Sequence, residues 1–151
     1  MLHFSYYNSP LGILEIVADE RDILAINFVK NIKKSKDNTL TKQCVIELKE
    51  YFNGQRRVFE VPVKLSGTIW QQKVLLNLSK IPYASIISYG DLAAMTGNAK
   101  AARAVGGAVN QNKIPIIIPC HRVLGGSGQL VGYAGGLAKK ATLLSLEQSF
   151  D

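Results

Sequence analysis

The sequence predicts an α+β protein with two parts, a small sheet-containing domain followed by a mainly helical one. Two observations lead to this fold class. Runs of alternating apolar residues, separated by turn residues, fill the first 29 positions, which is typical of an antiparallel meander. After residue 66, apolar residues recur at helical spacing, and two short helical segments are joined by a glycine-containing turn. We therefore expect domains over 1–63 and 66–151.

The first domain is expected to contain three or four strands and one helix. A helix capped by Thr39 or Thr41 runs to about Phe52, and Val58–Val63 has the composition of a further strand. Cys44 falls on the apolar stripe of the helix, where a core position is the simplest interpretation. No polar constellation stands out here. The first three strands are predicted at Leu2–Tyr7, Ile13–Ala18 and Ile23–Val29.

The second domain is expected to begin and end with a helix. Trp70, Val74 and Leu78 recur at helical spacing after the turn at 66–68, and we interpret them as core residues. The last helix is predicted from about Ala138 to Phe150. Between these helices, the glycine-rich segment 124–130 has the composition of a hairpin tip and could form a wing.

Two neighbouring helices in the middle of this domain resemble a helix-turn-helix. Ser88 and Asp91 give the capping-box pattern at the start of a short helix, Tyr89–Met95. After the turn at Gly97, Asn98 is expected to cap a second helix from about Ala99 to Asn110. This arrangement is typical of DNA-binding proteins, although many αα-hairpins bind nothing.

The second of these helices is almost entirely small residues, with Arg103 as one long cation in its middle. Gly106 and Gly107 each cost about 1 kcal/mol of helix stability relative to alanine in a helix interior. A close approach of the helix backbone to another surface should compensate for this loss. That approach is either to another helix or to DNA. Charge favours DNA, because residues 66–151 hold 8 basic and only 3 acidic side chains, whereas residues 1–65 hold 10 and 8.

Composition indicates a folded, soluble protein. The chain has 151 residues, is 47% hydrophobic and carries a formal charge of +7. It has no secretory signal pattern at its start, no run of about 20 apolar residues, and two distant cysteines. We therefore expect a cytoplasmic protein with free thiols. A metal site is not expected, since zinc needs about four ligands and the chain has only two cysteines and two histidines.

The stretch from Ile114 to Val123 carries the candidate chemistry. An apolar β-branched run, which should be buried, ends at Pro119, and Cys120 and His121 follow at once. A thiol becomes a nucleophile only as thiolate, which requires a nearby base or positive potential, and His121 and Arg122 are the nearest candidates in the sequence. The side chains of neighbouring residues usually point in different directions. His121 would therefore reach Cys120 through a bridging water, or a half-turn of the backbone would bring the two side chains together. The alternative is a buried structural cysteine beside a histidine that satisfies backbone groups.

Glu147 in the last helix has two interpretations as well. It lies one position from the apolar face, at Leu146, so it is either an ordinary solvated side chain or a buried carboxylate that orients His121.

The stretch Pro119-Cys120-His121-Arg122-Val123 resembles the alkyl-acceptor motif of the O6-alkylguanine-DNA alkyltransferases. Residues 101–108 resemble the recognition helix of that family, and Asn112, 88–89, 133–137 and Glu147 also align. The resemblance is strong from about Thr68 to Glu147 and weak before it. It implies a ribonuclease-H-like N-terminal domain and a C-terminal winged helix-turn-helix domain.

The resemblance also implies catalytic roles. Cys120 would accept the alkyl group, His121 would act as a base through a water, and Glu147 would orient His121. Asn112 would brace the turn around the site. Tyr89 would help to rotate the target nucleotide out of the duplex and could supply a proton to the leaving guanine.

Further residues would bind the nucleic acid. Arg103 would fill the gap left in the base stack, on a helix that also presents Lys100, Ala102 and Gly106. Tyr133, Val123 and Pro115 would wall the base pocket. The backbone of Cys120 and Ala134 would recognise the guanine edge, and Lys140 would add positive potential near the thiolate.

The implied function is repair of double-stranded DNA by direct, single-turnover transfer of an alkyl group from O6-alkylguanine to Cys120, with O4-methylthymine as a second candidate substrate. The base must leave the helix for this reaction. No cofactor is implied, and a monomer is expected.

One rival function is that of a lesion sensor that binds alkylated bases without repairing them, which the presence of Cys120 disfavours. A second rival is a Cys-His-Glu hydrolase. The chain departs from some members in lacking zinc ligands and in carrying Ala134 where they have serine.

Overall fold

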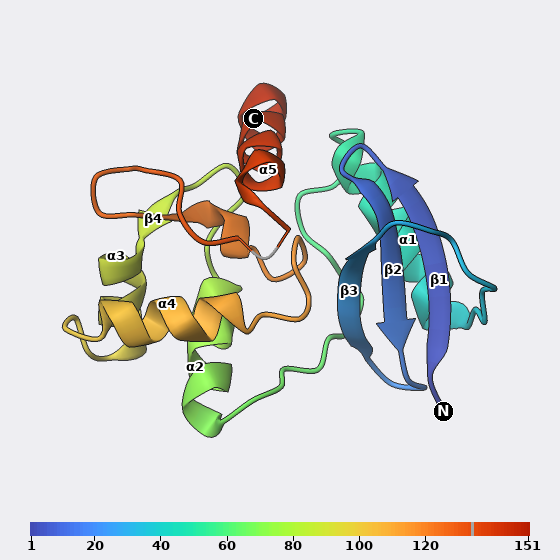
Figure 1. The fold of residues 1–151 in the computed structure, drawn as a ribbon, viewed down its shortest axis with the longest axis horizontal. Helices are drawn as coiled ribbons and strands as arrows, with labels where there is room; N and C mark the ends of the chain where they lie inside the picture. The colour runs from blue at the N-terminus through green and yellow to red at the C-terminus, as the bar shows by residue number, and fades with distance from the viewer. Residues whose placement is uncertain (134) are drawn as a thin grey trace. The chain divides into compact units, whose positions relative to one another are not determined.

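The structure of the protein is a computed structural model that describes residues 1–133 and 135–151. The chain divides into two compact units, Met1–Lys64 and Leu65–Asp151 (Figure 1). The first is a small antiparallel sheet with one helix, and the second consists mainly of helices.

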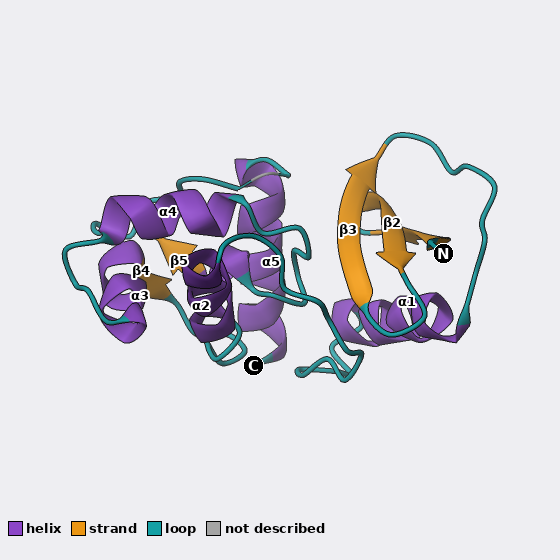
Figure 2. Ribbon diagram, turned by 90° about the horizontal axis from the view of Figure 1, so that it is seen from below, coloured by secondary structure: helices purple, strands orange, loops and turns teal. Residues whose placement is uncertain are grey.

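The first unit contains a three-stranded antiparallel sheet, which confirms the predicted meander. Its strands β1 (His3–Ser9), β2 (Gly12–Ala18) and β3 (Ile23–Val29) lie in the order β1-β2-β3. Helix α1 (Thr39–Phe52) packs against one face of the sheet (Figure 2). The core between them includes Leu14, Ile16, Cys44, Leu48 and Tyr51, all fully buried.

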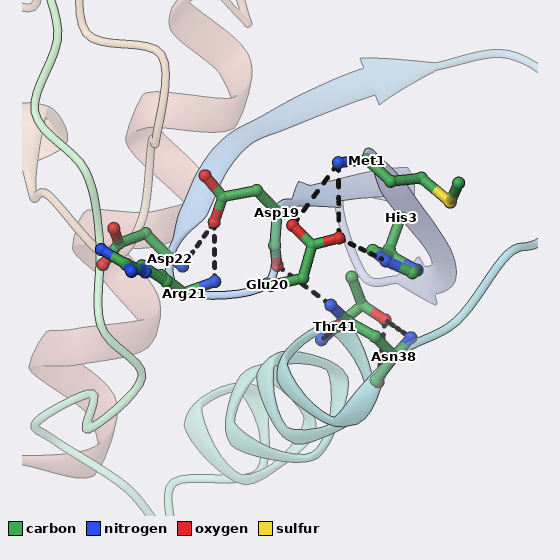
Figure 3. A network of polar contacts seen from close by, with 8 residues as sticks. All are labelled: Met1, His3, Asp19, Glu20, Arg21, Asp22, Asn38 and Thr41. Atoms are coloured by element: carbon green, nitrogen blue, oxygen red, sulfur yellow. Dashed lines mark hydrogen bonds and ion pairs between the residues drawn. The ribbon is translucent and has the colours of Figure 1, made fainter.

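Helix α1 is capped by Asn38 rather than by Thr39 or Thr41. The Asn38 side chain accepts a hydrogen bond from the backbone N–H of Thr41 (2.8 Å), and the Thr41 hydroxyl accepts one from the N–H of Asn38 (2.9 Å). Asn38 also donates to the carbonyl of Asp19 in the β2–β3 turn (3.0 Å; Figure 3). This one side chain therefore joins the start of the helix to a turn of the sheet.

The predicted strand Val58–Val63 is wrong, because only Val63 forms an isolated bridge, with Ile23. The buried carboxylate of Glu47 accepts hydrogen bonds from the backbone N–H groups of Glu60 (2.8 Å) and Val61 (3.2 Å). These donors are thus satisfied by a side chain of α1 instead of a strand ladder.

The second unit holds four α-helices among its described residues, together with a short 3₁₀ turn and a two-stranded parallel sheet. Helices α2, α3 and α4 pack on one another, and α5 contacts η1. The strands β4 and β5 place the segment before α3 beside the segment after η1. The elements are α2 (Ile69–Leu78), β4 (Ile87–Ser88), α3 (Tyr89–Thr96), α4 (Ala102–Asn110), η1 (Cys120–Arg122), β5 (Val123–Leu124) and α5 (Leu137–Phe150).

The helix-turn-helix is formed by α3 and α4, and its second helix starts later than predicted. Ser88 caps α3 with Asp91 in a reciprocal capping box, as expected. Asn98 does not cap α4. Its side chain accepts from the N–H of Lys100 (3.0 Å), which stabilises a local turn, and α4 begins only at Ala102. Lys100 therefore lies in the turn before the helix.

One other expectation for this unit needs correction. Val74 and Leu78 are buried in the core, but Trp70 is 38% exposed, because the first turn of α2 is open to solvent and Ile69 is 90% exposed. The segment 124–130 closes a turn through the Gly125 N–H and the Gln129 carbonyl (2.9 Å), which agrees with the predicted hairpin tip. Strand β5, which leads into this segment, pairs with β4 in parallel.

Candidate active site

A buried, irregular turn carries the chain to Cys120. Ile114, Ile116 and Ile118 are each at most 2% exposed, as the apolar run predicted. Ile116 has φ +74°, a left-handed conformation that is a rare outlier for a β-branched residue and persists only where the surrounding structure holds it. Across Pro119, the Cys120 N–H donates to the Ile118 carbonyl (2.8 Å), which is an inverse γ-turn. The position of Cys120 is therefore strongly fixed.

Asn112 spans this turn. Its Nδ2 donates to the carbonyl of Ile118 (2.9 Å), and its Oδ1 accepts from the N–H of Ile114 (3.0 Å). One amide therefore satisfies two backbone groups of an irregular segment, which is the geometry that a bracing role requires.

The thiol of Cys120 is buried, at the first position of η1. Burial raises the pKa of this thiol, whereas a hydrogen bond from Asn112 and the charge of Lys140 act in the opposite direction. The thiol is thus largely protonated at rest, and formation of the thiolate requires a base.

His121 follows Cys120 and pairs with Glu147 of α5. Its Nε2 lies 2.6 Å from Oε2 of Glu147, and both side chains are essentially inaccessible to solvent. The pattern of hydrogen bonds assigns the proton to Nε2, because the carboxylate can only accept there. The interpretation of Glu147 as an ordinary solvated side chain is thus wrong, since the carboxylate is buried and faces the imidazole.

The other ring nitrogen of His121, Nδ1, is buried and has no hydrogen-bond partner among the described residues. Burial lowers the pKa of His121, with Arg122 and Lys140 acting in the same direction and Glu147 opposing them. The ring is therefore neutral, with a lone pair on Nδ1. A neutral imidazole with an available nitrogen can act as a base.

Arg122 completes the cluster and was not among the predicted site residues. Its Nε donates to Oε1 of Glu147 and its Nη2 to Oε2, each at 2.9 Å, while Nη1 donates to the carbonyl of Ile81 (2.7 Å). Glu147 also accepts from the N–H of Ala84 (3.1 Å). The sequence suggested Arg122 only as a cation near the thiol. A buried carboxylate needs a charged or hydrogen-bonding partner, so Glu147 beside an apolar face signals that a partner exists but does not identify it as Arg122.

Lys140 lies inside the unit and ties two segments together. Its Nζ donates to the carbonyls of Val123 (2.5 Å) and Val131 (2.7 Å), and it lies 5.9 Å from the centroid of the Tyr89 ring. Burial lowers the pKa of Lys140, while Cys120 raises it. The ammonium group thus adds positive potential near the thiol and also holds the segment that leads to Tyr133.

Among the predicted catalytic and pocket residues, Tyr89 and Tyr133 interact electrostatically with Cys120. Tyr89, the first residue of α3, donates its hydroxyl to the Val131 carbonyl (3.3 Å). Burial raises the pKa values of Tyr89 and Tyr133, and the Cys120 thiolate, once formed, adds to both shifts. Both hydroxyls therefore lie within electrostatic reach of the sulfur. Val123 and Pro115 are buried on either side of Cys120 in the sequence. Ala134 lies outside the described residues.

The predicted DNA-binding residues lie on or just before α4. Arg103 and Lys100 are exposed, Ala102 and Gly106 are half-exposed, and Gly107 is exposed. A Cβ at Gly107 would meet nothing within 4 Å, and one at Gly106 would only touch the Tyr89 ring at 3.8 Å. Tight helix packing therefore does not require these glycines, which leave a low, open surface beside Arg103.

Over residues 1–133 and 135–151, no three His, Cys, Asp or Glu side chains gather as a metal site would require. Within the same residues no helix has the length and apolar character needed to span a bilayer.

The second unit thus combines a helix-turn-helix, whose second helix carries exposed residues, with a buried thiol and an imidazole that is hydrogen-bonded to a buried carboxylate. This is the arrangement of a DNA-binding protein with a nucleophilic cysteine. Residues 69–149 match the DNA-binding domain of 6-O-methylguanine DNA methyltransferase, and residues 2–65 match its ribonuclease-like domain. The chain belongs to the 6-O-methylguanine DNA methyltransferase family.

Relatives match over nearly the whole chain. A methylated-DNA–protein-cysteine methyltransferase of Methanosarcina acetivorans is 39% identical, covering 98% of this chain and 99% of its own. One from Haemophilus influenzae is 43% identical, covering 97% and 87%. The crystal structure of Mycobacterium tuberculosis OGT in complex with DNA is 38% identical, with a TM-score of 0.90 and coverage of 98% and 94%.

Proposed function

We propose that this protein repairs DNA by moving an alkyl group from O6 of guanine directly onto Cys120, with O4-methylthymine as a second candidate substrate. The observation that carries the proposal is the arrangement of Cys120, neutral His121 and buried Glu147 in a chain of this family. The relatives are named methylated-DNA–protein-cysteine methyltransferases. In this proposal residues 1–63 form a structural domain, and residues 66–151 bind DNA and accept the alkyl group. We also propose that it acts as a cytoplasmic monomer.

The chemical step is a displacement at carbon. The thiol proton passes to Nδ1 of His121, directly or through one water, and Glu147 stabilises the imidazolium. The sulfur of Cys120 then forms a bond to the alkyl carbon while the C–O6 bond breaks, and the electron pair leaves with guanine. The guanine takes up one proton, for which the Tyr89 hydroxyl is the candidate donor. The products are a thioether on Cys120 and an unmodified guanine, and no cofactor is needed.

The substrate has to be presented by base flipping. O6 of guanine lies inside the duplex, so the nucleotide must rotate out of the stack before its alkyl group can meet the sulfur. The exposed face of α4 supports a role in this step, because it is low at Gly107 and carries Arg103, a cation long enough to occupy the vacated place. Lys100, Ala102 and Gly106 would lie along the same contact.

The reaction consumes the protein. A thioether has no good leaving group, and the second cysteine, Cys44, belongs to the other unit, where burial raises the pKa of its thiol to about 12, with Glu47 adding to the shift. Each molecule therefore repairs one lesion. A lesion sensor would bind the same DNA without forming the thioether, and a hydrolase would turn over many substrates.

The deciding experiment is intact mass and peptide mapping after incubation with a duplex oligonucleotide containing O6-methylguanine. We expect one methyl mass per protein, located on the peptide that contains Cys120, and one restored guanine. An unchanged mass despite tight binding would leave the sensor as the correct description. Repair of many lesions per molecule, or a methyl group on Cys44, would contradict the proposed mechanism.

A further inference from the structure

Glu147 is shared between two partners, and the sharing is unequal. His121 makes one hydrogen bond to the carboxylate, at 2.6 Å, whereas Arg122 makes two parallel ones, at 2.9 Å each. All three side chains are at most 7% exposed. Because water is excluded from this cluster, solvent provides little screening and the charges act on one another strongly.

A carboxylate paired with imidazole alone would favour the imidazolium. An opposite charge at hydrogen-bond distance stabilises the protonated ring, and at rest this would block Nδ1 as a proton acceptor. The bidentate contact with Arg122 compensates the negative charge of Glu147 before His121 gains a proton. The imidazole thus remains oriented by the carboxylate without being protonated by it.

We propose that Arg122 is a positioning residue that keeps His121 neutral at rest by sharing the charge of Glu147, so that His121 enters the reaction as a base. This inference rests on the proposed function, since it assigns Arg122 a part in the activation of Cys120. It goes beyond a structural ion pair, because it predicts a change in the protonation of His121 when Arg122 is replaced.

The other charged groups around His121 are consistent with a neutral ring at rest. Lys140 of α5 carries a positive charge that also disfavours the imidazolium, and Cys120 is neutral at rest because burial raises its pKa. Glu147 is the group that favours the imidazolium, and it is the group that Arg122 holds. Removal of Arg122 therefore leaves the carboxylate without its strongest partner.

The test is the titration of His121 in Arg122→Gln, followed by the ¹⁵N and ¹H shifts of the imidazole ring. The chain has only two histidines, so the ring signals can be assigned by comparison with a His3→Gln sample. We expect the titration midpoint of His121 to rise by roughly 1–3 pH units, the range that a nearby charge produces. The acid limb of the pH–rate profile measured with free O6-benzylguanine should move to higher pH by the same amount.

Arg122→Lys provides a second variant in case the glutamine variant does not fold. Lysine keeps the positive charge but lacks the planar fork, so the His121 midpoint should shift in the same direction by a smaller amount. The proposal would be overturned if the His121 titration midpoint did not move in the folded variants, or if the rate fell by the same factor at every pH. Arg122 would then be a purely structural partner of Glu147. Failure of the proposed function is a separate result, seen as no alkyl transfer in the unaltered protein, and the histidine titration does not depend on it.

Discussion

His121 and Glu147 meet across 26 residues of sequence, with Nε2 and Oε2 2.6 Å apart in a site closed to solvent. The contact fixes which nitrogen of the ring holds the proton and leaves the lone pair on Nδ1. It is also the contact that sequence reasoning could only offer as one of two interpretations of a glutamate in the last helix.

Replacement of Glu147 by glutamine should slow alkyl transfer by roughly 100-fold, the lower end of what a positioned acid–base group contributes. An amide stabilises the imidazolium poorly and can present a donor where Nε2 needs an acceptor. The rate with free O6-benzylguanine measures the effect without any DNA step. If the rate is unchanged while the protein remains folded, Glu147 has no part in activating the thiol.

Cys120→Ala should abolish transfer and leave DNA affinity nearly unchanged, because the thiol is buried while Arg103 is exposed on α4. Cys44→Ala is the matched control, since it removes the other buried thiol and should retain full transfer. Binding to an undamaged duplex, measured at several salt concentrations, should weaken with salt equally in all three proteins. A loss of affinity in Cys120→Ala as large as its loss of activity would contradict this division of roles.

Arg103→Ala should slow repair of a duplex by about tenfold or more, because unstacking costs a few kcal/mol per step and each 1.4 kcal/mol corresponds to tenfold. The reaction with free O6-benzylguanine should be unaffected, since a free base leaves no gap to fill. Lys100→Ala is the comparison, and it should mainly reduce the salt dependence of binding. Equal losses on both substrates would place Arg103 in the chemistry or in the fold.

Gly107→Ala should stabilise the protein and weaken its binding to DNA. A methyl group there meets nothing within 4 Å, so the helix gains up to about 1 kcal/mol from better propensity. The same methyl would stand between α4 and a closely approaching duplex. Thermal unfolding and duplex affinity measure the two effects. An unchanged affinity would mean that the low surface of α4 is not needed for contact with DNA.

The free energy of unfolding should fall as the pH drops below about 6.5, in part because of His121. Its pKa is lowered in the folded protein, so below that pH the unfolded chain binds a proton that the folded chain does not. The loss approaches about 1.4 kcal/mol per pH unit for one such group. Urea unfolding of His121→Gln should show a correspondingly smaller dependence on pH. Parallel curves for the variant and the unaltered protein would contradict the buried, neutral imidazole.

Local patterns predicted much of the fold. Strand β3 was predicted at its observed bounds, and the capping box at Ser88 was found as expected, because both depend on short-range chemistry. The late start of α4 was missed, since Asn98 can serve a turn as well as a helix cap. Trp70 was misplaced because helical spacing alone does not show whether the first turn of a helix is covered.

Some contacts of the candidate site could be predicted from the sequence, and others could not. Cys120 and His121 are adjacent in the sequence, so their pattern could be recognised directly. The bidentate pairing of Arg122 with Glu147 joins η1 to α5, and no periodicity or spacing encodes it. The same holds for Lys140, whose ammonium group reaches carbonyls 9 and 17 residues away. Such contacts follow from the packing of the whole unit.

The contacts of Glu147 have a consequence for the order of folding. Its carboxylate joins α5 to Ala84, 63 residues earlier in the chain, and to η1, 25 and 26 residues earlier. Contacts of such large sequence separation form only after the entropy of closing the intervening loops has been overcome. His121 thus lacks its acceptor until α5 has docked, and until then Cys120 has no oriented base. Nucleophilic reactivity of this thiol should therefore arise late in folding, and its appearance in a refolding experiment would time the docking of the last helix.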